Sequence, residues 1–128
     1  DLPRLSGGGA WCGSAAELSR LIASIDGMPH VKDILSKKSI QFMTTEQPDH
    51  QYSIGWNYTP KSNRPWIRTG SLAGTSAIVL KYPDGQCWIL ITNTSTWKGH
   101  GFSNDSMAFF EKLRKQFMAD MPKKDLFI

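Results

Sequence analysis

The sequence predicts an α+β fold in which an antiparallel sheet of about three strands is covered by an amino-terminal-side helix and a carboxy-terminal helix. Two apolar runs, residues 77–80 and 87–93, flank the Pro-Asp-Gly turn signal of residues 83–85, which is typical of a β-hairpin. Residues 14–17 and 107–121 show the patterns of a capped helix start and of an amphipathic helix. Together these elements favour a sheet with helices packed on it, as a single domain over residues 1–128.

The composition indicates a globular chain with a hydrophobic core of its own. Apolar residues make up 40% of the 128 residues and charged residues 20%, which argues against disorder. No apolar run approaches the ~20 residues that a membrane span needs. The first four residues lack the features of a signal peptide, so any targeting segment would have been upstream and removed.

Charge and cysteine content narrow the classes of partner. The formal net charge is +4, but the basic residues form short, dispersed groups, which favours solvated faces over a nucleic-acid patch. The two cysteines, Cys12 and Cys87, lie outside any CxxC motif or His/Cys cluster, so we expect no bound metal and no cofactor. Two buried thiols are favoured over a disulfide between Cys12 and Cys87, and the sequence leaves both alternatives open.

The first helix is predicted from a capping box. The Ser14 hydroxyl and the Glu17 carboxylate can each satisfy an amide of the first turn. An apolar stripe then recurs at helical spacing, and Gly27 supplies a left-handed stop. The stripe consists of Leu18, Leu21, Ile22 and Ile25.

The next two segments are predicted from shorter patterns. Residues 31–45 fit two short helical pieces, with Ser36 capping the second. Tyr52, Ile54 and Trp56 alternate with polar or small residues, which is the period of a half-buried strand.

The final helix is predicted to begin after a cap at residue 104, 105 or 106. Its inner stripe consists of Met107, Phe110, Leu113, Phe117 and Met121, and Pro122 ends it. We expect the polar residues between them to face water, namely Glu111, Lys112, Arg114 and Lys115.

The strongest functional signal is Arg68-Thr69-Gly70-Ser71 at the edge of a strand. A cation, a hydroxyl and a glycine in succession can offer a negatively charged ligand a charge, a donor and a close backbone approach. This is the logic of an anion or oxyanion subsite. The alternative is that Arg68 is a strand-end charge and Gly70 a close-packing position.

Five motifs follow one another in an order that carries a resemblance. They are Gly-Gly-x-Trp-x-x-Ser-x-x-Glu-Leu before the first helix, Met43-Thr44-Thr45, Tyr52-x-Ile54-Gly55-Trp56, Arg68-Thr69-Gly70-Ser71-Leu72-x-Gly74-Thr75-Ser76 and Tyr82-Pro83-Asp84-Gly85. Over most of its length the chain resembles the carboxy-terminal part of the serine β-lactamase-like hydrolases. This superfamily includes class C β-lactamases, penicillin-binding proteins, D-alanyl-D-alanine carboxypeptidases and esterases.

The resemblance implies roles for the candidate residues. Arg68-Thr69-Gly70 stands where the family has Lys-Thr-Gly on its third strand, and the Ser71 backbone amide would donate to the oxyanion hole. Arginine keeps the cation and can hold a carboxylate with two hydrogen bonds, but it cannot join a proton relay as lysine can.

The resemblance also shows what this chain lacks. The family's nucleophile lies in Ser-x-x-Lys at the start of a buried helix, whereas the one match here, Ser95 to Lys98, follows the last predicted strand and reads as chance. The family's first two strands would precede Asp1. We therefore expect the chain alone to be inactive, with a sheet edge or an apolar face exposed.

Three functional hypotheses stay open at this point. The first is the carboxy-terminal module of a serine hydrolase, with an upstream catalytic segment of the same protein as its partner. The second is a binding module for carboxylate-bearing peptides or cell-wall fragments, and the third is an interaction domain that associates with itself through a sheet edge. The resemblance suggests the periplasm or the cell envelope as the compartment.

Overall fold

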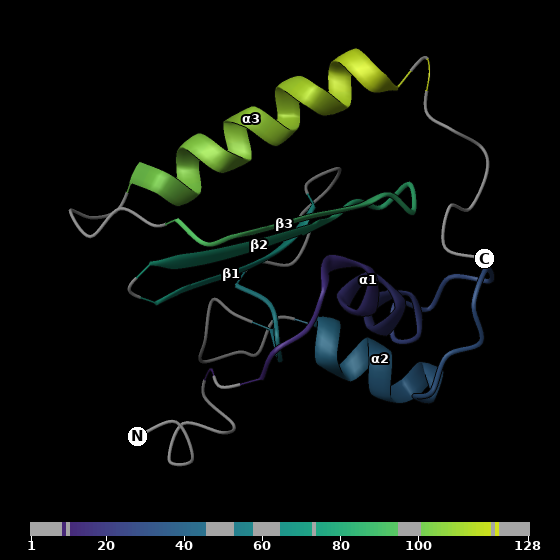
Figure 1. Ribbon diagram of the computed structural model, residues 1–128. Coiled ribbons are helices and arrows are strands. Elements are labelled where there is room, and N and C mark those ends of the chain that lie inside the picture. Colours follow the sequence, from purple (N-terminus) through teal and green to yellow (C-terminus); the bar gives the residue numbers. More distant parts are fainter. Residues whose placement is uncertain are drawn as a thin grey trace.

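The computed structural model describes residue 9 and residues 11–45, 53–57, 65–72, 74–94, 101–118 and 120. Its elements, in chain order, are α1 (Ala15–Ala23), α2 (Lys37–Thr44), β1 (Trp66–Leu72), β2 (Thr75–Lys81), β3 (Cys87–Thr92) and α3 (Gly101–Phe117). Helices α1 and α2 lie on one side of the sheet and α3 lies on the other (Figure 1). The predicted α+β class is confirmed.

The sheet is an antiparallel meander with the order β1-β2-β3. The predicted hairpin is its β2–β3 half, where the Tyr82 amide donates to the Gln86 carbonyl at 2.8 Å. Gly85 has a φ of 93° in this turn, a backbone conformation that favours glycine. The Pro-Asp-Gly signal was therefore read correctly, since it sets a turn that only a few residue types can form.

The predicted amino-terminal caps of α1 and α2 are both confirmed. The Ser14 hydroxyl accepts from the Glu17 amide at 3.2 Å, and the Glu17 carboxylate accepts from the Ser14 amide at 2.7 Å. Gly27 adopts a φ of 74° shortly after α1 ends. The Ser36 hydroxyl accepts from the Ser39 amide at 3.1 Å and so caps α2.

Two predictions about the segments before the sheet are wrong. Residues 31–35 form no helix, because the Ile34 amide donates to the Ser24 carbonyl at 2.8 Å and ties this stretch back to the end of α1. Residues 53–57 form a turn closed by an isolated bridge between Ser53 and Trp56, with Gly55 at a φ of 87°. The third strand of the sheet is β1 rather than the predicted strand at residues 52–56.

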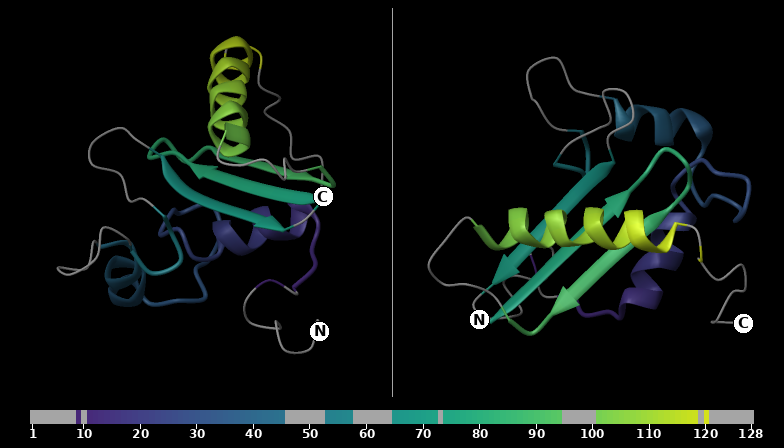
Figure 2. Two further views of the ribbon diagram at one scale, coloured as in Figure 1. Left: turned by 90° about the vertical axis from the view of Figure 1, so that its left-hand side faces the viewer. Right: turned by 90° about the horizontal axis from the view of Figure 1, so that it is seen from above.

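The two faces of the sheet carry separate hydrophobic clusters. On the α3 side the buried residues are Ile78, Leu80, Tyr82 and Phe110. On the α1 side they are Ile22, Trp56 and Val79. Strand β2 supplies both clusters from alternate positions, so the central strand is covered on both faces, as in a three-layer arrangement (Figure 2).

Helix α3 differs from its prediction at its start and in its polar residues. It begins at Gly101, before the predicted cap, and Phe117 is exposed. The predicted positions Ser95, Lys98 and Met121 lie outside the described residues. Glu111 and Arg114 do not simply face water, because Glu111 accepts a hydrogen bond from the Tyr82 hydroxyl and Arg114 pairs with Asp84 at 2.5 Å.

Candidate functional site

The predicted subsite residues lie along β1, which is an edge strand of the sheet. Arg68 and Ser71 are exposed and Thr69 is half-buried. The Arg68 guanidinium donates to the Asn57 side-chain carbonyl at 3.4 Å, and the Asn57 side-chain amide donates to the Thr69 hydroxyl at 3.5 Å. The turn at residues 53–57 therefore positions the cation and the hydroxyl of the subsite from outside the sheet.

The backbone of β1 points hydrogen-bonding groups away from the sheet at alternate residues. The Ile67 carbonyl accepts from the Asn57 amide at 2.7 Å on the side away from β2. Because an antiparallel strand turns the N–H and C=O of one residue to the same side, and of the next residue to the other side, Thr69 and Ser71 also face outward. The structure thus places the Ser71 amide on the outer edge of β1, three residues after Arg68.

Gly70 and Ser71 lie on the same edge strand, after Arg68 and Thr69. A Cβ added at Gly70 would meet no atom within 4 Å, so no close contact in the described part of the chain requires glycine there. The Ser71 hydroxyl donates to the Thr75 carbonyl at 3.4 Å. The proposal that Gly70 is a close-packing position therefore loses its support. The β1 edge offers an anion the Arg68 guanidinium and the outward backbone amides of Thr69 and Ser71.

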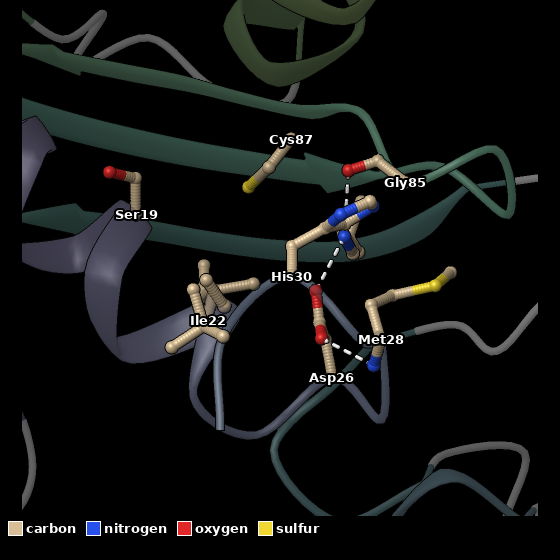
Figure 3. Close-up of a pocket in the computed structure, with 10 residues that line it drawn as sticks. Ser19, Ile22, Asp26, Met28, His30, Gly85 and Cys87 are labelled. Carbon is tan, nitrogen blue, oxygen red and sulfur yellow. Dashed lines mark hydrogen bonds and ion pairs between the residues drawn. The ribbon is translucent and has the colours of Figure 1, made fainter. Parts of the chain in front are cut away.

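A second arrangement of charged groups, which the sequence analysis missed, lies between α1 and the β2–β3 turn. The Lys81 ammonium pairs with the Asp26 carboxylate at 2.6 Å, and the two side chains are only 6% and 4% exposed. Lys81 also donates to the Gly85 carbonyl at 2.8 Å, while Asp26 accepts from the Met28 amide at 2.8 Å (Figure 3). Lysine directly after the apolar run of residues 77–80, at the position facing α1, is the signal that could have predicted this pair.

A pocket of about 220 Å³ opens beside this ion pair. Ser19 and Ile22 of α1 line one wall, and Cys87 at the start of β3 lines another, with His30 from the loop after α1 (Figure 3). Burial raises the pKa of the Cys87 thiol to about 11. The charge of Lys81 lowers this pKa and the charge of Asp26 raises it, and both effects are smaller than that of burial. At neutral pH this sulfur is a neutral thiol, which disfavours a role as a nucleophile.

The two cysteines are both thiols, so no disulfide joins them. Cys12 is exposed, whereas burial was expected for both. Among the described residues there is no group of three or more His, Cys, Asp or Glu side chains that could hold a metal ion.

The subsite on β1 and the pocket beside Lys81 are separate features. The four predicted residues, Arg68 to Ser71, contribute nothing to the pocket lining.

Comparison of the chain with protein-family models, with curated proteins and with solved structures found no match. Within the described part of the chain, no helix combines the length and the apolar character that crossing a bilayer requires.

Proposed function

We propose that this chain is the carboxy-terminal module of a β-lactamase-like serine hydrolase, and that its β1 edge binds the carboxylate and the reacting carbonyl of an acyl substrate. The observation that carries the proposal is that Arg68 shares the edge strand β1 with Thr69 and Ser71, whose backbone amides point outward. Charge-assisted hydrogen bonds from a guanidinium are the strong ones for a carboxylate, and backbone amides can stabilise an oxyanion.

The order of the elements supports the same proposal. A capped helix, a glycine-containing edge strand and a hairpin with the Pro-Asp-Gly turn follow one another, and the sheet lies between helices on both faces. In the hydrolase family that the chain resembles, the nucleophile and its base belong to a segment upstream of this part. The β1 edge alone supplies binding and electrostatic stabilisation but no attacking group, so turnover requires that segment.

The proposed subsite can be tested by calorimetric titration with a short acetylated dipeptide that ends in a free carboxylate. Replacing Arg68 with alanine removes the guanidinium and should weaken binding by about 1.5–3 kcal/mol, the range for hydrogen bonds to charged groups. Arg68→Lys is the matched control, because it keeps the charge but loses the two-pronged geometry, and should fall between the two. Equal affinities for all three forms would contradict the proposal.

The alternative of a non-catalytic binding module shares the same subsite. The two differ in whether the parent polypeptide carries a Ser-x-x-Lys sequence upstream. Adding that upstream segment should restore covalent labelling by a serine-reactive probe if the chain is a hydrolase module. Carboxylate binding without any labelling in the longer protein would favour the binding module.

A further inference from the structure

We infer that the pocket between α1 and the β2–β3 turn binds a small uncharged carboxamide with a short aliphatic chain. The head of this ligand binds the buried ion pair of Lys81 and Asp26, and its chain lies along the apolar part of the lining. The pocket shares no lining residue with the four residues of the β1 subsite, so the inference does not rest on the proposed function. It rests on the hydrogen-bonding capacity of the ion pair, the charge balance of the lining and the size of the cavity.

The ion pair has hydrogen-bonding capacity that its described partners do not use. An ammonium has three N–H donors, and Lys81 uses two of them, on Asp26 at 2.6 Å and on the Gly85 carbonyl at 2.8 Å. The Asp26 carboxylate has about four acceptor sites and receives Lys81 and the Met28 amide. Both side chains line the pocket and are only 6% and 4% exposed. Because buried polar groups are normally hydrogen-bonded, a ligand that offers both an acceptor and a donor is favoured beside them.

The charges of the lining favour an uncharged head group. Lys81 and Asp26 balance each other, and exposed His30 borders the pocket from the loop after α1. A carboxylate head would be attracted by Lys81 but repelled by Asp26, and an ammonium head would meet the reverse. Either ion would also lose hydration on entering the pocket. An uncharged head avoids both costs.

A primary carboxamide matches both charged groups at once. Its carbonyl oxygen can accept from the Lys81 ammonium, and its amide nitrogen can donate to the Asp26 carboxylate. Hydrogen bonds to ionised groups are shorter than neutral ones and about twice as strong. An ester of the same size offers acceptors but no donor, so it can match Lys81 alone. The carboxamide is thus the head group that the ion pair selects.

The rest of the lining sets the size and the character of the chain. Beside the ion pair, Ile22 of α1 and the uncharged Cys87 thiol of β3 border the same space (Figure 3). The volume of about 220 Å³ corresponds to about seven water molecules at ~30 Å³ each. A carboxamide with a chain of about four carbon atoms fills such a space, and its CH₂ groups gain free energy by leaving water. Pentanamide is therefore the probe that fits.

The test is an NMR titration of the ¹⁵N-labelled chain at pH 7.5 with three probes of equal size, namely pentanamide, pentanoate and methyl butanoate. Pentanamide should shift the backbone amides of Gly85 and Cys87 saturably, with a Kd on the order of 1 mM, because so small a ligand has few atoms to contribute affinity. The other two probes should bind there at least about tenfold more weakly, since neither can donate to Asp26. Pentanoate bound at the β1 edge is recognised separately, by shifts at Thr69 and Ser71.

A substitution that fills the pocket tests the place of binding. Ala23 is the last residue of α1 and lines the pocket, and methionine there keeps a good helix former while it occupies the space. Ala23→Met should weaken pentanamide binding at least about tenfold. Ala15→Met is the matched control, because Ala15 lies on the same helix but is exposed and outside the lining, and it should leave the affinity unchanged. If Ala23→Met fails to fold, Ser19→Leu fills the same pocket from one turn earlier on α1.

Three results would overturn the inference. The first is the absence of saturable shifts at Gly85 and Cys87. The second is equal or tighter binding of pentanoate or methyl butanoate at these amides, which would mean that the ion pair does not select a carboxamide. The third is nuclear Overhauser contacts, in the ligand-free protein, from the Ile22 methyl groups to residues outside the described ranges, which would mean that the chain fills the pocket itself.

Failure of this inference and failure of the proposed function can be told apart. The pocket is read at Gly85 and Cys87 with pentanamide, whereas the β1 subsite is read at Thr69 and Ser71 with the dipeptide carboxylate. A chain that binds only one of the two ligands would contradict one statement and leave the other standing.

Discussion

Neutralising Asp26 should destabilise the protein more than any surface substitution. Asp26→Asn keeps the size of the side chain and an acceptor for the Met28 amide, but it removes the charge that balances Lys81. The Lys81 ammonium is then left 6% exposed without a counterion, with the Gly85 carbonyl as its remaining described partner. Breaking a buried pair by removing one charge costs about 3–5 kcal/mol. This is a large share of the roughly 5–15 kcal/mol by which small domains are stable.

A double-mutant cycle isolates the ion pair from the other contacts. Lys81→Met removes the opposite charge and should cost a similar amount, because the Asp26 carboxylate then stays buried with only the Met28 amide as its described donor. The double variant, Asp26→Asn with Lys81→Met, leaves no buried charge, so we expect it to cost about 1–2 kcal/mol, mainly from the lost hydrogen bond to Gly85. The two changes should thus be far from additive.

The assay is urea unfolding followed by far-ultraviolet circular dichroism at 25 °C, with the free energy of unfolding obtained by linear extrapolation. Lys112→Met on the exposed side of α3 serves as a control for loss of a charge outside this pair. A cost below about 1 kcal/mol for Asp26→Asn would refute the buried pair. So would a double variant as unstable as the sum of the single ones.

Three further predictions concern the first helix, the cysteines and the reactivity of the isolated chain. Ser14→Ala should lower the free energy of unfolding by about 1 kcal/mol. Hydrogen bonds from the Ser14 backbone amide and hydroxyl lower the pKa of Glu17, so the stabilisation that the Glu17 carboxylate adds is present above the unfolded-state pKa and fades as the pH falls below 4.5. The difference in stability between the protein and a Glu17→Ala variant should therefore shrink in acid, and a difference that stays constant would contradict the capping box. Iodoacetamide at pH 8 should modify exposed Cys12 well before Cys87, whose thiol has a pKa of about 11, and equal rates in peptide mass spectra would refute the burial of Cys87. The isolated chain should neither hydrolyse a chromogenic β-lactam nor be labelled by a covalent serine probe, and stoichiometric labelling of any serine, Ser95 included, would show that it carries a nucleophile of its own.

The features that the sequence predicted well are those fixed within a few residues. The capping box needs only Ser14 and Glu17, three positions apart, and the β2–β3 turn needs a glycine that can take a positive φ at Gly85. In each case neighbouring residues supply the interaction that decides the local structure.

The features that the sequence predicted wrongly depend on contacts between distant segments. The alternation of Ile54 and Trp56 imitates a strand, but Gly55 turns the chain and Trp56 packs under β2 in the α1-side cluster. The prediction that Arg114 faces water was also wrong, because it used only the polarity of the residue. The partners of Arg114 in the β2–β3 turn lie about thirty positions away in the sequence. Such pairings follow from the way the layers stack, which a single pattern cannot show.

The buried pair of Asp26 and Lys81 lies between these two cases. The period of β2 puts Lys81 on the same face as Val79, which belongs to the apolar α1-side cluster. Nothing near Lys81 in the sequence identifies Asp26 as its partner, because the pairing arises only when α1 docks beside the β2–β3 turn.

The most direct test of the proposed function is an NMR titration of the ¹⁵N-labelled chain with the acetylated dipeptide carboxylate. Backbone amides that point outward along β1 should report the ligand, so we predict saturable shifts at Thr69 and Ser71, with little change at Leu90 on the far strand. The shifts should largely disappear in Arg68→Ala and persist more weakly in Arg68→Lys. Shifts that avoid β1, or that are the same with and without the Arg68 guanidinium, would contradict the assignment of this edge as the carboxylate subsite.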